Sequence, residues 1–141
     1  MKIDVTLDPR AEDCRALRDG FREYELSVFP SIPSETEDQP LAAFARRADG
    51  SVCAGIEAKL YWDGLEIALL WVAPDQRDKG LGTQLLLEVE RVARERGAVI
   101  AFLKTFFARE FYERLGYEVF GVLEDRPIGS KLYHMKKRLD V

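Results

Sequence analysis

Histidine and cysteine are nearly absent from this chain. His134 is the single histidine among 141 residues, and the two cysteines, Cys14 and Cys53, lie far apart in the sequence. A zinc site or a redox dithiol needs several such residues at close spacing, so the sequence predicts neither. A Ser-His-Asp or Cys-His catalytic apparatus would depend on His134, which no nucleophile motif accompanies. We expect no metal, and we expect both cysteines to pack as small apolar residues.

Long apolar runs and an excess of positive charge are also missing. The longest apolar run, residues 67–74, is far shorter than the ~20 residues of a membrane-spanning helix, and the first residues do not read as a signal peptide. The 25 acidic residues outnumber the 21 basic ones, which disfavours a nucleic-acid-binding protein. We therefore expect a cytoplasmic protein that binds neither a membrane nor nucleic acid.

The composition that remains is typical of a globular protein with one domain over residues 1–141, with 47% hydrophobic and 33% charged residues. The charges are unevenly distributed. Residues 1–40 carry ten acids and five bases, whereas residues 76–109 carry seven bases and four acids. The basic segment suits an anionic ligand and the acidic segment suits a cationic one, although ordinary solvated surfaces explain such charges equally well.

The first half of the chain predicts a strand, a helix and three further strands. The strand is at 2–6, and Asp8 and Pro9 begin a helix that runs to about Leu26, with an apolar face that we expect to belong to the core. A proline-rich acidic loop follows. Three antiparallel strands at 41–47, 51–61 and 65–72 are then joined by Asp49-Gly50 and Asp63-Gly64, two dipeptides typical of hairpins.

The second half predicts an α/β arrangement. Helical periodicity runs from Gly82 to a stop at Gly97, and the apolar stretch 98–103 follows as a strand. Because a helix separates it from 65–72, we expect these two strands to be parallel. A short helix at 108–115 and an antiparallel pair at 117–123 and 130–138 complete a mostly antiparallel sheet flanked by helices.

The turn between the strand at 65–72 and the following helix is a candidate anion site. It reads Arg77-Asp78-Lys79-Gly80-Leu81-Gly82-Thr83. A glycine turn that enters a helix presents free backbone N–H groups and a positive dipole end. The spacing fits neither the nucleotide-kinase loop, which needs a Lys after its second glycine, nor the dinucleotide fingerprint, because Leu85 replaces the third glycine.

This Arg-x-x-Gly-x-Gly turn resembles the acyl-CoA-binding turn of the GNAT (Gcn5-related N-acetyltransferase) superfamily. A second motif, Phe111-Tyr112-Glu113-Arg114-Leu115-Gly116-Tyr117, resembles the FYxxLGF/Y motif of the same family, in the same order along the chain. The resemblance covers nearly the whole chain. It implies the GNAT fold, in which the parallel central strands splay apart around acetyl-CoA.

The resemblance also implies roles for individual residues. Main-chain groups of Leu70, Trp71 and Val72 would bind the thioester carbonyl, and Tyr112 would protonate the departing CoA thiolate. The pyrophosphate would be held by the turn, that is, by Arg77, Asp78, Lys79, Gly80, Leu81, Gly82 and Thr83. Thr105 stands near the position where many relatives have an Asn that contacts the pantetheine arm, and is expected to supply a smaller polar contact.

The residue that deprotonates the amine stays open at the level of sequence. Glu66 matches the offset of the catalytic glutamate in the histone-acetylating branch of the family, Glu57 on the preceding strand is the reserve, and a water chain is the third option. A solvent-facing strand residue explains Glu66 equally well.

Taken together, the sequence predicts an acetyl-CoA-dependent N-acetyltransferase in which a primary amine, on a small molecule or a protein, attacks directly within a ternary complex. The alternative is a non-catalytic acyl-CoA-binding domain, and a remoter one is a small nucleic-acid-binding module. Acceptor choice would depend on the acidic loop 35–38, on Tyr61 and Trp62, and on the last strands. The pattern neither requires nor forbids a homodimer.

Overall fold

The computed structural model describes residues 1–34 and 37–141 and forms two compact units, residues 1–34 and residues 35–141. The first unit contains one helix, α1 (Ala11–Val28). Its loop returns along the helix, where the Arg22 guanidinium donates hydrogen bonds to the carbonyls of Ile32 (3.4 Å) and Pro33 (3.5 Å).

Two predictions for this unit are wrong. Residues 2–6 form no strand, since the unit contains no second strand to satisfy an extended backbone. The helix begins at Ala11 with Arg10 as its N-cap, two residues later than predicted. Asp8 lies in a preceding turn, where its N–H donates to the Thr6 hydroxyl (3.0 Å). The prediction that the apolar face of α1 belongs to the core stays a prediction, since the unit by itself buries none of the helix.

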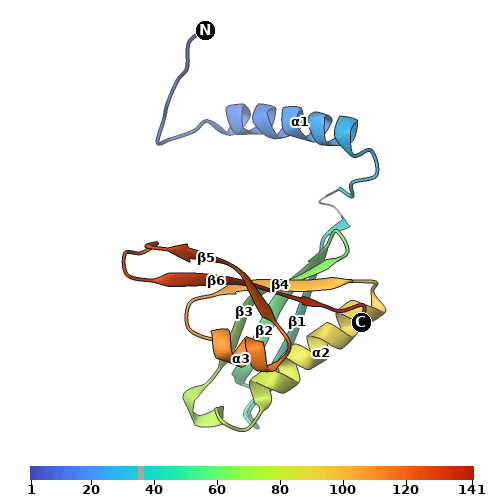
Figure 1. Cartoon of the computed structure of the whole chain (residues 1–141), viewed down its shortest axis with the longest axis vertical. Coiled ribbons are helices and arrows are strands. Elements are labelled where there is room, and N and C mark those ends of the chain that lie inside the picture. Colours follow the sequence, from blue (N-terminus) through green and yellow to red (C-terminus); the bar gives the residue numbers. More distant parts are fainter. Residues whose placement is uncertain (35–36) are drawn as a thin grey trace. The chain divides into compact units, whose positions relative to one another are not determined.

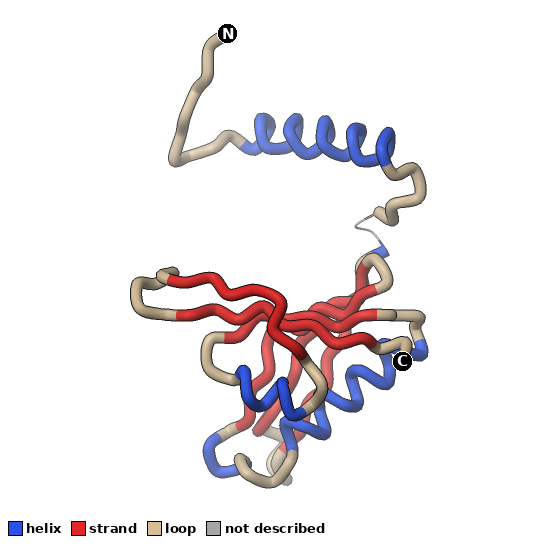
Figure 2. Tube along the Cα trace, in the orientation of Figure 1, coloured by secondary structure: helices blue, strands red, loops and turns tan. Residues whose placement is uncertain are grey.

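The second unit is built on one sheet of six strands in the order β1-β2-β3-β4-β6-β5 (Figures 1 and 2). Its elements are β1 (Gln39–Arg46), β2 (Val52–Tyr61), β3 (Gly64–Val72), the short 3₁₀ helix η2 (Pro74–Gln76), α2 (Leu81–Glu95), β4 (Ile100–Thr105), α3 (Arg109–Arg114), β5 (Glu118–Glu124) and β6 (Lys131–Arg138). Only β3 and β4 are parallel. The predicted α/β class, the order of helices and strands from β1 onward and the parallel pair are confirmed.

Both predicted hairpins of β1–β3 form, but the second turn is one residue earlier than predicted. Tyr61 pairs with Gly64, so the central residues are Trp62 and Asp63, with φ of 50° and 62°. Positive φ at both positions is the two-residue turn whose twist matches antiparallel strands. Gly64 therefore lies inside β3, where a Cβ would come within 3.3 Å of the Phe102 ring.

The core lies between α2 and the sheet. The helix covers one face of β1, β2 and β3 (Figure 1), and its apolar stripe is buried through Leu85, Leu86, Val89 and Ala93. These side chains pack with Ile56, Leu65 and Met135 from three strands. This packing fixes the N-terminus of α2 relative to the end of β3, which is where the predicted anion turn lies.

In the part of the chain that is described, no helix is long and apolar enough to cross a membrane.

Candidate functional site

The parallel strands β3 and β4 pair only at one end and then diverge. The pairing is limited to Gly64–Glu66 on β3 and Ile100–Phe102 on β4. On its other side β3 stays paired with β2 up to Val72, with a register shift that leaves Ala68 without a partner. The rest of β3 therefore presents backbone N–H and C=O groups without ladder partners towards β4. The predicted splaying of the central pair is confirmed.

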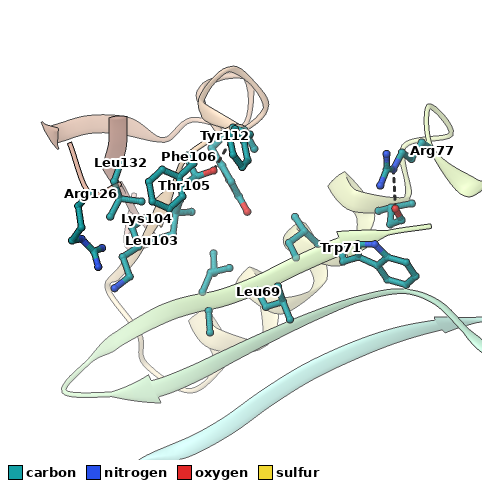
Figure 3. A pocket seen from close by; sticks show the side chains of 16 residues that line it. Leu69, Trp71, Arg77, Leu103, Lys104, Thr105, Phe106, Tyr112, Arg126 and Leu132 are labelled. Carbon is teal, nitrogen blue, oxygen red and sulfur yellow. Dashed lines mark hydrogen bonds between the residues drawn. The ribbon is translucent and has the colours of Figure 1, made fainter. Parts of the chain in front are cut away.

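A cleft of about 750 Å³ occupies the opening between the two strands (Figure 3). It is lined by Ile67–Val72 of β3, by residues 103–108, which cover the end of β4 and the start of the loop after it, and by Arg77, Tyr112, Arg126 and Leu132. Leu70, Trp71 and Val72, the residues predicted to bind a thioester carbonyl through the main chain, all lie along this cleft. Thr105 also lines it, and its hydroxyl accepts a hydrogen bond from the Ala108 N–H (3.1 Å) at the entrance to α3.

A second cavity of about 470 Å³ lies at the N-terminus of α2. It is lined by Arg77, Asp78, Gly80, Leu81, Gly82 and Thr83, together with Gln76, Ala108, Phe111, Leu70 and Val72. Six of the seven predicted turn residues therefore surround it, and Lys79 does not. The two cavities share Leu70, Val72, Arg77 and Ala108, so they form one continuous cleft.

The backbone of the turn makes the second cavity a good anion site. Gly80 is the N-cap in the left-handed region, with φ of 76°, and Asp78 has φ of 63°. The first intrahelical bond runs from the Gln84 N–H to the Gly80 carbonyl (3.0 Å), so the N–H groups of residues 81–83 have no acceptor within the helix. No acidic residue occupies the first turn of α2. The positive end of the helix dipole is therefore open to an anion.

Arg77 connects the two parts of the cleft. Its Nε donates to the carbonyl of Val72 (2.9 Å), which holds the guanidinium beside the end of β3. Arg77 lines both cavities of the continuous cleft. A basic group therefore lies between the anion turn and the opening of the strands.

Tyr112 lies in α3 and points into the cleft between β3 and β4 (Figure 3). Its side chain is 6% exposed, and burial raises its pKa to about 12. The hydroxyl has no hydrogen-bond partner among the described residues. Because no fully buried side-chain oxygen or nitrogen in that part of the chain lacks a partner, the hydroxyl must be accessible from the cleft. Tyr112 is therefore a neutral O–H donor aimed at the space between the strands.

The ring of Tyr112 is held by its aromatic neighbours. Phe111 and Tyr117 both contact it edge-on, at centroid distances of 5.0 and 5.6 Å. Tyr117 is itself anchored, because its hydroxyl donates to the buried carboxylate of Glu90 on α2 (2.7 Å). Lys137 of β6 donates to the other oxygen of Glu90 (2.8 Å). Burial, with the negative charge of Glu90, raises the pKa of Tyr117, so this phenol too stays neutral.

The two candidate bases lie outside the cleft lining. Glu66 is half-buried in β3, opposite Lys59 of β2 and Phe102 of β4, one residue before the cleft begins. It is close to Tyr61, whose pKa is raised by burial and then by the negative charge of Glu66. Glu57 is exposed on β2 and borders a separate hollow of about 120 Å³ with Leu69 and Trp71. The structure thus brings Tyr112 and the turn together along the cleft, whereas neither Glu66 nor Glu57 lines it.

The acidic loop 35–38 is described in part. Glu35 lies outside the described residues, and Glu37 is exposed. The carboxylate of Asp38 lies 3.7 Å from Lys59, whose ammonium group in turn lies 4.6 Å from the centre of the Tyr61 ring. Asp38 is therefore already paired with a cation.

Several cleft residues were missed by the sequence reasoning. Phe111 forms a wall of the anion cavity, and a Cβ on Gly82 would contact its ring at 3.5 Å. Lys104, Phe106, Arg126 and Leu132 line the larger cavity. Phe111 stands in a recognised motif and was detectable there. Arg126 was not, because only the folding of the β5–β6 hairpin brings residue 126 to β4. Within residues 1–34 and 37–141, no group of histidine, cysteine and acidic side chains is arranged to hold a metal.

Comparison with known proteins gives one consistent result. The family model for the acetyltransferase (GNAT) family matches residues 10–117. The chain is 33% identical to a blasticidin-S acetyltransferase of Streptomyces morookaense, over 98% of this chain and 96% of that protein. An acetyltransferase of Bacillus cereus ATCC 14579 has the same fold, with a TM-score of 0.81 and 27% identity over 96% of this chain and 97% of the other. An aminoglycoside 6'-N-acetyltransferase solved with coenzyme A shares the fold alone, with a TM-score of 0.65 and 19% identity over 96% and 97% of the two chains.

Proposed function

Because the chain belongs to the acetyltransferase (GNAT) family, we propose that it transfers the acetyl group of acetyl-CoA to a primary amine through the continuous cleft between β3, β4 and the N-terminus of α2. The observation that carries this proposal is the alignment of an open anion site, an unpaired strand edge and a buried tyrosine along one cleft. The family match spans residues of both units, which supports treating 1–141 as one acetyltransferase domain.

The co-substrate is bound at three places in this proposal. The pyrophosphate accepts hydrogen bonds from the backbone N–H groups of residues 81–83, assisted by Arg77. The pantetheine arm runs along the unpaired edge of β3, with Thr105 as a polar contact from the opposite strand. The thioester carbonyl accepts from the main-chain N–H groups of Leu70 and Val72, which stabilise the oxyanion of the tetrahedral intermediate. These two N–H groups point away from β2, because the Ala73 N–H donates to the Cys53 carbonyl of β2 and N–H directions alternate along a strand, which turns the Trp71 N–H towards β2.

The reaction is a direct attack. The neutral amine forms a C–N bond to the acetyl carbon, the intermediate collapses, and the C–S bond breaks as the thiolate leaves. Tyr112, which is protonated at every physiological pH because burial raises its pKa to about 12, gives its proton to this thiolate and regains a proton from solvent. The proton lost by the amine reaches solvent through water, with Glu66, beside the closed end of the cleft, as the proposed acceptor. No side chain is acylated.

The acceptor is an amine that reaches the cleft on the side of Tyr112 away from the anion turn. Blasticidin S is one candidate member of this class, because a blasticidin-S acetyltransferase is 33% identical over nearly the whole chain. Small metabolites and protein amines are other members.

Calorimetric titration with acetyl-CoA, followed by thiol release against an amine panel in the same preparation, tests the proposal. We expect binding together with thiol release on one class of amines. Binding without thiol release on any amine would favour a non-catalytic acyl-CoA-binding domain, and the absence of binding would contradict the assignment of the cleft.

A further inference from the structure

The end of the cleft that the co-substrate leaves free carries two positive charges. Lys104 lies near the end of β4, and Arg126 lies in the loop between β5 and β6. Both side chains line the 750 Å³ cavity. Figure 3 shows them together at one end of it, with Arg77 at the opposite end and Tyr112 between. The proposed function assigns the Arg77 end to the pyrophosphate, so the Lys104 and Arg126 end is left for the acceptor.

Neither charge is neutralised by the described part of the chain. Lys104 and Arg126 form no ion pair and no side-chain hydrogen bond with residues 1–34 or 37–141. Asp125, the nearest carboxylate in sequence to Arg126, accepts instead from the Gly129 N–H within its own loop (3.0 Å). The other described charged residue lining this cavity is Arg77, which is also basic. Every charged side chain among the described residues that line this cavity is therefore basic.

A positive acceptor end disfavours a simple cationic amine. Such a molecule would meet two like charges at short range, and low-dielectric cleft walls such as Leu103, Phe106 and Leu132 strengthen that repulsion. A second, anionic group on the acceptor reverses the sign of the interaction. Guanidinium and ammonium donors that line the same end of a cleft suit the oxygens of a carboxylate or a phosphate.

We propose that Lys104 and Arg126 form an anion subsite, so that the acceptor is an amine that also carries a carboxylate or phosphate group. The amine of such a molecule lies towards Tyr112 and the thioester, and its anionic group lies at the outer end of the cleft. The two cations also favour the neutral form of the bound amine, which is the nucleophile. This inference depends on the proposed function, and it adds an anionic group to the cationic acceptor that the acidic segment was expected to suit.

Matched pairs of amines test the subsite. Each pair shares the amine and differs in one group: 4-aminobutanoate against 4-aminobutanamide for the carboxylate, and 3-aminopropyl phosphate against 3-aminopropanol for the phosphate. Thiol release gives kcat/KM for each, and calorimetry on protein saturated with coenzyme A gives the affinity without turnover. We expect at least one anionic member to exceed its neutral partner about tenfold or more, which corresponds to one charged hydrogen-bonded contact.

Variants locate the effect. Lys104→Gln and Arg126→Gln are expected to remove most of that preference while leaving the KM for acetyl-CoA unchanged. Lys131→Gln is the matched control, because Lys131 is an exposed cation of the same hairpin that does not line the cleft. A loss of preference in Lys131→Gln as well would show a long-range charge effect and would overturn the subsite.

The two failures have different signatures. If anionic and neutral amines are equal in both rate and affinity, or if the preference survives in the double variant Lys104→Gln/Arg126→Gln, the subsite is wrong while the transferase stands. If the anionic amine of a pair binds more tightly than its neutral partner but no thiol is released, the subsite stands and the proposed function fails. If acetyl-CoA itself does not bind, both fail.

Discussion

Replacing Tyr112 by phenylalanine isolates the proposed general acid. The hydroxyl has no hydrogen-bond partner among the described residues, and the ring contacts with Phe111 and Tyr117 are kept. The free energy of unfolding should therefore change by no more than about 0.5 kcal/mol. A positioned general acid contributes roughly 10²- to 10⁴-fold, or about 2.7 to 5.4 kcal/mol of the barrier. We expect kcat to fall by that factor while the affinity for acetyl-CoA stays within about threefold.

The same substitution at Tyr117 is the matched control. The Tyr117 hydroxyl donates to the buried Glu90 carboxylate, so its removal should cost about 1.5 to 3 kcal/mol of stability, as for other hydrogen bonds to charged groups. Since a phenylalanine ring still supports Tyr112, kcat should fall less than about fivefold. The pair of variants is measured by thiol release, by calorimetry with acetyl-CoA and by urea unfolding.

The two phenol variants should thus show opposite patterns, one losing turnover and the other losing stability. Turnover of Tyr112→Phe within about threefold of the parent would refute the assignment of Tyr112 as the general acid. A large stability loss in Tyr112→Phe would show instead that the hydroxyl has a structural partner.

Four further results are expected. Gly80 has a φ of 76°, and no atom lies within 4 Å of a Cβ added there. Gly80→Ala should therefore lower the free energy of unfolding by about 1 kcal/mol through backbone strain, and it should weaken acetyl-CoA binding about tenfold in calorimetry. Unchanged affinity would argue against the turn as the phosphate site. Lys137→Met should lower the free energy of unfolding in urea by about 3 kcal/mol, because it leaves the buried Glu90 carboxylate with fewer donors. The double variant Glu90→Gln/Lys137→Met should recover most of that stability. Additive losses from the two substitutions would contradict this coupling. Because the pKa of Tyr112 is raised to about 12 from the ordinary value near 10, the unfolded state loses its proton first, so stability should decrease between pH ~10 and ~12 by up to about 2.7 kcal/mol, and Tyr112→Phe should lack this part. Glu66→Gln should lower kcat about tenfold or more in thiol release, and an unchanged kcat would leave the amine proton to water alone.

Much of the fold could be predicted because its signals are local. The apolar face of α2, the glycines at 80 and 97 and the two hairpins each depend on neighbouring residues. The predicted bounds agree with the structure to within about two residues at most ends, as expected where caps and turns set them. The turn at Trp62 and Asp63 was placed one residue late because Asp-Gly is the usual hairpin dipeptide, while here Gly64 is needed in the strand against Phe102.

The failures depend on contacts that a linear pattern does not contain. Residues 2–6 alternate like a strand, but a strand forms only where a partner strand is available. The helix begins at Ala11, and Asp8 lies before it in a turn in which its N–H donates to the Thr6 hydroxyl.

The candidate site likewise contains residues that local motifs predict and residues that only the fold brings to the cleft. Its anion turn and Tyr112 stand in recognisable motifs and were found from the sequence. Lys104 and Arg126 come together only through the register of β4 and the length of the β5–β6 hairpin, which no short motif records. Glu66 satisfied the spacing of a catalytic glutamate, yet it lies one residue before the cleft lining.

The central claim is that one cleft holds acetyl-CoA with its sulfur beside Tyr112 and its pyrophosphate at the N-terminus of α2. A crystal structure of the protein with coenzyme A tests this most directly. The account predicts pyrophosphate oxygens on the backbone N–H groups of residues 81–83 and the sulfur within hydrogen-bonding distance of the Tyr112 hydroxyl. Coenzyme A bound with its sulfur away from Tyr112, or outside the opening between β3 and β4, would contradict it.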